Sequence, residues 1–243
     1  MANNKYEFTG ETMRFRGHTL HRIRAKVDFG IVKAGDLGGW VEDEYNLNVV
    51  GDAWVHGDAM VFGHAIVYGN AKVYGDAKVY GNARVYGDAT VFEKAKVYGD
   101  ANVYGNVSVY GDARVYGNAI VCGNASVHQG AWIYGYARVY GNVDVYNRAR
   151  VSGKARVSGE AIICNNAVVR NSTDYIVFKN CWSSMRWFTY TRSNRKWKVG
   201  CFLGTGDELI KKAYADSTKS GKCYEAIVKT VEAIETAMQK KKE

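Results

Sequence analysis

The sequence predicts an all-β solenoid, a parallel β-helix with a small N-terminal β-cap and a C-terminal segment of strands and helices. Three observations predict this fold class. The 243 residues include 27 glycines and 18 tyrosines but no proline, a composition typical of repetitive β structure. An aliphatic residue recurs at every sixth position from Val49 to Val169, which gives twenty-one consecutive matches. The residue four positions after it is alanine or valine from Ala53 to Ala167.

The repeating unit reads V-Y-G-D/N-A-x, as in residues 73–78. A period of six fits a short strand followed by a tight corner, and three such units close a coil of 18 residues. Each inward valine then stacks on the valine 18 residues later, at the spacing of parallel strands. Glycine with aspartate or asparagine supplies the corner, so we interpret these aspartates as corner residues and expect no metal site. About seven coils are expected over 48–171.

This unit resembles the bacterial transferase hexapeptide repeat, in its aliphatic position and in the small residue four positions later. The resemblance covers residues 48–171 and implies a left-handed parallel β-helix that is usually a homotrimer. Residues 28–42 and 51–55 resemble the entry region of YdcK-type hexapeptide proteins and of similar proteins carried by prophages. That second resemblance implies a protein encoded by a phage or another mobile element.

The two ends differ from the repeat. Residues 1–47 alternate apolar and polar side chains between glycines and are expected to form the β-cap, because an open solenoid end would aggregate. Residues 172–243 are expected to hold a β-hairpin and two helices. The expected strands are Tyr175–Phe178, Arg186–Arg192 and Lys196–Phe202, and the expected helices are 207–216 and 222–240. The last helix carries an apolar face that comprises Cys223, Ile227, Val231, Ile234 and Met238.

The period also sorts the outward side chains into vertical columns. On one face the residues that precede the inward valines form a basic column with one tryptophan: Lys78, Lys96, Arg114, Trp132 and Arg150. The residues that follow the same valines form a tyrosine column, which includes Tyr98, Tyr116 and Tyr134. Cations beside aromatic rings could bind phosphate and stack a planar ring. The alternative is packing of tyrosines between coils, with lysine and arginine stems lying over them.

A second face carries Tyr74, Phe92, Tyr110 and His128 with few charges, which favours a subunit interface. His128 also lies in a unit that departs from the consensus. Acetyltransferases of the resembled family use a histidine base at a subunit interface, so the resemblance makes His128 the candidate acid–base catalyst. Those enzymes usually interrupt the repeat with an insertion that shapes the substrate pocket, whereas this repeat runs without one. An interface or surface role for His128 is therefore the alternative.

The C-terminal hairpin is a second basic and aromatic candidate. Residues 172–206 carry six basic residues and one acidic residue, while the whole chain has a formal net charge of +9. This local excess points to an anionic partner, with nucleic acid as one candidate. The candidate residues are Arg186, Phe188, Tyr190, Arg192, Lys196 and Lys198.

Three function classes follow. The first is a non-catalytic binding protein that captures a small anionic, nucleotide-like ligand or a protein partner and needs no cofactor. The second is an acyltransferase that uses His128 and an acyl-CoA donor such as acetyl-CoA, and the third is a structural scaffold. Binding is favoured because no catalytic motif stands out. The five cysteines form no CxxC motif, and neither a secretory leader nor an apolar span is found, so we expect a cytoplasmic protein that does not enter a membrane.

Overall fold

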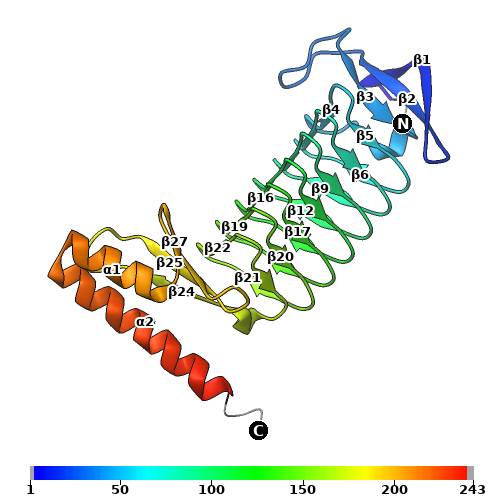
Figure 1. The fold of residues 1–243 in the computed structure, drawn as a ribbon. Coiled ribbons are helices and arrows are strands. Elements are labelled where there is room, and N and C mark those ends of the chain that lie inside the picture. Colours follow the sequence, from blue (N-terminus) through cyan, green and yellow to red (C-terminus); the bar gives the residue numbers. More distant parts are fainter. Residues whose placement is uncertain (1–2, 240–243) are drawn as a thin grey trace. The chain divides into compact units, whose positions relative to one another are not determined.

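The computed structural model describes residues 3–239, and the chain divides into two compact units, Met1–Asp174 and Tyr175–Glu243. The first unit holds the cap and the solenoid, and the second holds a sheet and two helices (Figure 1). The boundary lies three residues beyond the expected start of the C-terminal segment. The reason is that a short 3-10 helix, η2 (Ser172–Asp174), contacts the last coil and belongs with it.

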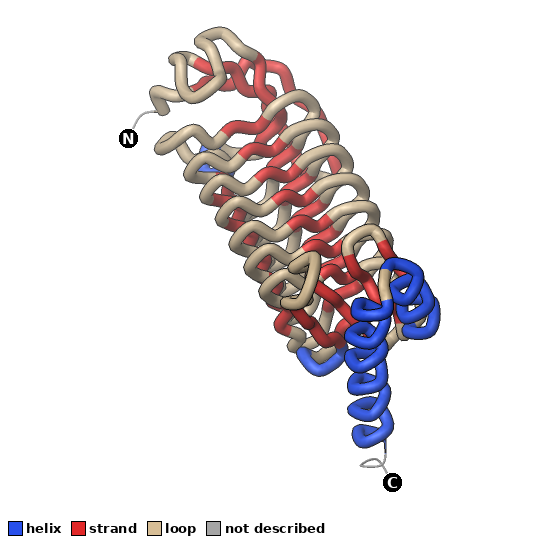
Figure 2. Tube along the Cα trace, turned by 90° about the vertical axis from the view of Figure 1, so that its left-hand side faces the viewer, coloured by secondary structure: helices blue, strands red, loops and turns tan. Residues whose placement is uncertain are grey.

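The solenoid is a parallel β-helix of about seven coils with three faces, as the six-residue period predicts. Successive strands of each face lie directly above one another (Figure 2). The first face, after the cap strands, runs through β5 (Met60–Val61), β8 (Lys78–Val79), β11 (Lys96–Val97), β14 (Arg114–Val115), β17 (Trp132–Ile133), β20 (Arg150–Val151) and β23 (Val168–Val169).

The other two faces are built in the same way. The second face runs through β4 (Trp54–Val55), β7 (Lys72–Val73), β10 (Thr90–Val91), β13 (Ser108–Val109), β16 (Ser126–Val127), β19 (Asp144–Val145) and β22 (Ile162–Ile163). The third runs through β6 (Ile66–Val67), β9 (Arg84–Tyr86), β12 (Asn102–Tyr104), β15 (Ile120–Val121), β18 (Arg138–Val139) and β21 (Arg156–Val157).

The valine columns form the core of the solenoid. Val73, Val91 and Val109 pair in parallel register and are fully buried, as the period predicts. Backbone N–H groups donate to the next coil; for example, Lys96 N donates to Ala113 O at 2.9 Å. Proline has no N–H to donate, which explains why the repeat excludes it.

Corner aspartates and asparagines bond to one another along the solenoid axis. The Asn82 amide donates to the Asp100 carboxylate at 2.8 Å, and the Asn70 amide donates to Asp88 at 3.0 Å. The corner interpretation of these residues is therefore confirmed. Among residues 3–239, no group of three or more His, Cys, Asp or Glu side chains is arranged to hold a metal ion.

The start of the repeat differs from the expectation. Val49 fits the six-residue period but is 41% exposed, whereas Leu47 is fully buried and bridges to Val67. Val41 likewise pairs with Val61, so the first coil is two residues longer than the others and begins inside the expected cap. The extra length accommodates the 3-10 helix η1 (Glu44–Asn46). Val49 therefore matched the period without occupying the core.

The cap strands are β1 (Tyr6–Phe15), β2 (His18–Ala25) and β3 (Leu37–Val41). β1 and β2 pair antiparallel, β2 pairs antiparallel with β3, and β3 pairs parallel with β5 of the first face. The cap thus extends the first face and covers its first coil. Met1 and Ala2 of the expected cap lie outside the described residues.

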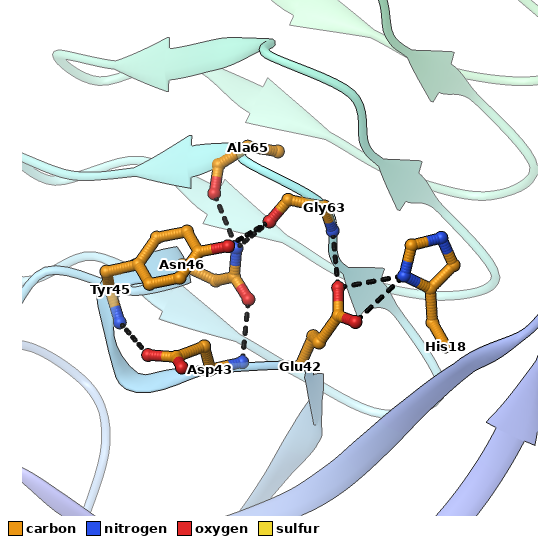
Figure 3. A network of polar contacts seen from close by, with 7 residues as sticks. All are labelled: His18, Glu42, Asp43, Tyr45, Asn46, Gly63 and Ala65. Carbon is orange, nitrogen blue, oxygen red and sulfur yellow. Dashed lines mark hydrogen bonds and ion pairs between the residues drawn. The ribbon is translucent and has the colours of Figure 1, made fainter.

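A polar network fixes the cap to the first coil (Figure 3). The buried Asn46 amide donates to Gly63 O at 3.0 Å and to Ala65 O at 2.8 Å, and its oxygen accepts from Asp43 N. Glu42 accepts from Gly63 N at 2.7 Å and pairs with His18 at 2.8 Å. The burial of Glu42 would raise the pKa of its carboxyl, but these hydrogen bonds outweigh it and hold the pKa below 4.5.

The second unit is a four-stranded antiparallel sheet with two helices. The strands follow chain order: β24 (Tyr175–Lys179), β25 (Trp187–Thr191), β26 (Lys196–Val199) and β27 (Phe202–Gly204). The predicted hairpin is present as β25 and β26. The helices are α1 (Gly206–Asp216), which starts at a capping box of Thr205 and Glu208, and α2 (Thr218–Gln239). Lys240, the expected last residue of α2, lies outside the described residues.

The predicted apolar face of α2 is only partly correct. Val231 is buried together with Val228, and Ile227 packs against the same core, but Ile234 is 38% exposed and Met238 is 42% exposed. A 22-residue helix is about 33 Å long, whereas the strands of this sheet have at most five residues, or about 17 Å. The last turns of α2 therefore extend past the sheet.

Candidate functional site

The basic column of the first face forms as the period predicts. Lys96 pairs in register with Lys78 on one side and with Arg114 on the other, and Arg114 is followed by Trp132 and Arg150. Their outward side chains are therefore spaced at the separation of neighbouring strands, about 4.8 Å. Because the inward valine or isoleucine beside each is fully buried, the column rests on a packed aliphatic core.

A groove of about 290 Å³ runs between this column and the corner that precedes it. It is lined by Asp76, Lys78, Lys94, Lys96, Asp112 and Arg114. Lys94 occupies a corner position at which the two neighbouring coils carry Asp76 and Asp112. Within residues 3–239, neither Lys94, Lys96 nor Arg114 forms an ion pair. We call this surface the basic groove.

The electrostatics of the basic groove favour an anion. Burial lowers the pKa of the Lys96 ammonium, and the positive charges of Arg114 and Lys78 lower it further. Arg16 of the cap contributes in the same direction. The cations therefore repel one another in the unliganded protein, and a bound anion would relieve that repulsion.

Trp132 lies between two guanidinium groups. The guanidinium carbon of Arg114 is 5.0 Å from the Trp132 ring centroid and that of Arg150 is 4.9 Å from it, and the two arginines come from the coils on either side. Both faces of the indole are thus covered. The expectation that Trp132 stacks a ligand ring is not supported, because a ring could reach the indole only by displacing an arginine.

The tyrosines beside the column are also stacked on one another. Tyr98 and Tyr116 have ring centroids 4.8 Å apart at an interplanar angle of 1°, and Tyr116 and Tyr134 are 5.1 Å apart at 4°. Both faces of Tyr98 and of Tyr116 are occupied by neighbouring rings, and Tyr134 is covered by a ring on one face. These tyrosines therefore pack between coils, as the alternative interpretation of the sequence has it, and Tyr98 and Tyr116 offer no free ring face to a ligand.

A second depression continues along the same face. Its volume is about 690 Å³, and it is lined by Asp112, Arg114, Gln129, Gly130, Trp132, Arg148, Arg150, Asn166 and Val168. Arg148 is a corner residue in the same column as Lys94, and both corners bring a cation beside the cation of the following strand. The second depression therefore resembles the basic groove in its charge.

His128 is enclosed rather than presented to a substrate. Its ring stacks between Tyr110 at 4.6 Å and Tyr146 at 5.0 Å, and Nε2 lies 3.0 Å from Asp144 Oδ1. The other ring nitrogen, Nδ1, is buried and has no hydrogen-bond partner within residues 3–239. A base must reach the proton that it removes, so this arrangement favours packing as the role of His128.

The hairpin residues do not form one surface. Phe188 and Tyr190 pack in the core against α1 and α2, together with Trp197. Lys196 and Lys198 pair across the strands with Thr191 and Thr189, so they lie on the opposite face of the sheet. β25 is amphipathic, and its aromatic side, which carries Phe188 and Tyr190, is the side that the helices bury.

The two arginines of this candidate also separate. The Arg192 guanidinium donates to Glu235 of α2 at 2.6 Å, and Arg186 is exposed. Arg192 is therefore already paired with a carboxylate of the same unit. No shared anion site results from the set.

Sequence reasoning missed four charged residues that line the basic groove and its continuation: Lys94, Arg148, Asp76 and Asp112. They occupy corner positions, which were assigned to backbone geometry alone. A signal was present, because residues 93–94 and 147–148 replace the glycine–aspartate corner with Glu-Lys and Asn-Arg. Placing the basic substitution at the corner beside the basic strand residue would have located the groove.

A family model described as YdcK Beta solenoid repeat matches residues 77–93 and 113–129. The chain therefore contains repeats of the YdcK β-solenoid type, and both matched stretches lie in the coils that carry the basic groove. No match to a curated protein was found. No helix within residues 3–239 is long and apolar enough to cross a membrane.

Proposed function

We propose that this protein binds a small phosphate-bearing anion in the basic groove without transforming it. The observation that carries the proposal is the row of Lys78, Lys96 and Arg114, which lie one above another with no ion pair to Lys96 or Arg114 within residues 3–239. A charge-assisted hydrogen bond contributes roughly 1.5–3 kcal/mol, so two such contacts supply roughly 3–6 kcal/mol, which corresponds to a dissociation constant between the millimolar and the tens-of-micromolar range.

The protein recognises the ligand through its phosphates, and an aromatic ring on the ligand adds little to the binding free energy. The faces of Trp132, Tyr98 and Tyr116 are already covered. A nucleotide would therefore bind through its phosphate chain, much as inorganic tripolyphosphate would.

The proposal is tested by calorimetric titration with sodium tripolyphosphate at low ionic strength. Lys96→Gln is expected to weaken binding about tenfold, which corresponds to about 1.4 kcal/mol. The matched control is Lys72→Gln, because Lys72 fills the same slot on the second face between Trp54 and Thr90. Absence of binding by the wild-type protein, or equal losses in the two variants, would overturn the proposal.

Acyl transfer is the competing function, but Nε2 of His128 already pairs with Asp144 and Nδ1 is buried. Incubation with acetyl-CoA, followed by a thiol-release assay, tests it directly. Release of CoA that depends on the protein and disappears in His128→Asn would replace binding with catalysis as the function.

We further propose that the protein acts as a homotrimer joined in part by the second face. In support, Tyr74, Phe92, Tyr110 and His128 form a half-buried aromatic stack on that face. Interfaces are enriched in aromatic side chains and depleted in charge at their centre. Light scattering at micromolar concentration tests this assembly, and a monomer mass would contradict it.

A further inference from the structure

The basic groove and the second depression are parts of one track. Both are lined by Asp112 and Arg114, so the basic groove leads into the second depression along the first face. Six cations line the two together: Lys78, Lys94, Lys96, Arg114, Arg148 and Arg150. The only carboxylates among the lining residues are Asp76 and Asp112. The track is therefore strongly positive.

The cations follow the solenoid axis because the fold repeats. The strands from β8 to β20 are five neighbours in one sheet, so the column from Lys78 to Arg150 spans about 19 Å at about 4.8 Å per coil. A compact anion can contact the cations of two or three neighbouring coils. Only an extended anion can contact both ends of the track.

The aromatic neighbours decide which extended anion fits. Single-stranded nucleic acid is usually held by bases that stack on exposed aromatic faces. Here the Trp132 faces are covered by Arg114 and Arg150, and Tyr98 and Tyr116 stack on each other. The track offers charge along a line, and the ring faces of Trp132, Tyr98 and Tyr116 are closed to a base. These features favour a polymer of phosphates without bases.

We propose that the ligand of this track is a linear inorganic polyphosphate chain that lies along the solenoid axis. This inference rests on the proposed function, because it extends the basic groove to a longer ligand of the same chemistry. The chain contacts Lys78, Lys94, Lys96 and Arg114 in the basic groove. It then passes to Arg148 and Arg150 in the second depression.

The test compares the binding of tripolyphosphate with that of a polyphosphate longer than the track. Concentrations are expressed per phosphate, so that a long chain does not seem to bind more tightly merely because it offers more binding positions. Wild-type protein is expected to bind the long chain about tenfold more tightly. Arg148→Gln with Arg150→Gln should remove this length dependence, while tripolyphosphate should still bind in the basic groove. The control variant, Arg84→Gln with Arg138→Gln, removes the same charge from the third face and should retain the length dependence.

The outcomes separate the two proposals. Failure of tripolyphosphate to bind wild-type protein overturns the proposed function. Binding of tripolyphosphate without a length dependence, or with one that survives in the Arg148 and Arg150 variant, overturns only the polyphosphate track. An oligothymidylate of equal charge that binds more tightly than polyphosphate would show that bases are recognised, and would also overturn it.

Discussion

Replacing Lys96 by glutamine is expected to stabilise the fold while weakening anion binding. Lys96 lies between Lys78 and Arg114 on adjacent strands, and burial together with these two charges lowers the pKa of its ammonium. The fully buried Val97 beside it is untouched by the substitution. Glutamine keeps most of the side-chain length, so the change removes charge rather than packing.

The magnitude follows from the spacing of the coils. Two unit charges about 4.8 Å apart repel by about 0.9 kcal/mol in water, and physiological salt roughly halves this. Lys96 has two such neighbours, but its attraction to Asp112 is lost as well. The free energy of unfolding should therefore rise by about 1 kcal/mol at low ionic strength, and by less in salt.

Urea unfolding followed by circular dichroism, at low and high salt, measures this difference. Lys72→Gln is the control, because its strand neighbours Trp54 and Thr90 are uncharged. A second readout is pH. Since the folded protein releases the Lys96 proton at a lower pH than the unfolded chain, stability rises with pH in the window below 10.5. Lys96→Gln should lose that contribution. A destabilised variant, or one that matches Lys72→Gln at low salt, would refute the reasoning.

Three further predictions concern the cap and the aromatic stacks. Glu42 has a pKa held below 4.5 in the fold, so its contribution is present above pH 4.5 and is lost as pH falls through the lower folded pKa; Glu42→Gln should flatten that part of an acid unfolding curve. Asn46→Ala should lower the free energy of unfolding by roughly 2–3 kcal/mol in urea, because the buried carbonyl of Ala65 loses its donor and the backbone N–H of Asp43 loses its acceptor. ATP should bind no more tightly than tripolyphosphate in a calorimetric competition, since both faces of Trp132 are covered; a preference for ATP that Trp132→Ala abolishes would contradict this.

The repeat made most of the solenoid predictable because each unit carries its own geometric requirements. An inward valine, a small residue and a corner that tolerates a positive φ recur at fixed spacing, so the stacking of Val73 on Val91 could be predicted without tertiary information. Where the chain leaves the repeat, long-range bonds decide. Leu47 rather than Val49 is buried because Asn46 bonds to Gly63 and Ala65, and no local pattern specifies that pairing.

The site was predictable to the level of columns and no further. The period alone placed Lys78, Lys96 and Arg114 on one line, and the structure brings them together. Whether the Trp132 faces are free depends on the side-chain conformations of Arg114 and Arg150, which the period does not specify. The six-residue period also says nothing about the C-terminal hairpin, where the helices that cover one face of the sheet determine which side chains become core.

Glu93 departs from the repeat, and replacing it tests whether this departure costs folding stability at a corner beside the basic groove. It adopts φ of 56° at a corner where Gly75 and Gly111, one coil away on either side, have φ of 68° and 66°. A non-glycine residue in this region costs roughly 1–2 kcal/mol, while glycine costs roughly 0.5–1 kcal/mol in chain entropy.

Glu93→Gly should therefore raise the free energy of unfolding by about 0.5–1 kcal/mol, and removing a carboxylate next to Lys94 should strengthen tripolyphosphate binding. The matched variant Asn147→Gly changes the equivalent corner three coils on, where φ is 51°. Asparagine tolerates this conformation, so the gain there should be close to zero. Urea unfolding of both variants measures the difference. If Glu93→Gly raises the free energy of unfolding no more than Asn147→Gly does, the Glu93 corner is not strained. The presence of glutamate there would then cost no stability, and no function would be needed to account for it.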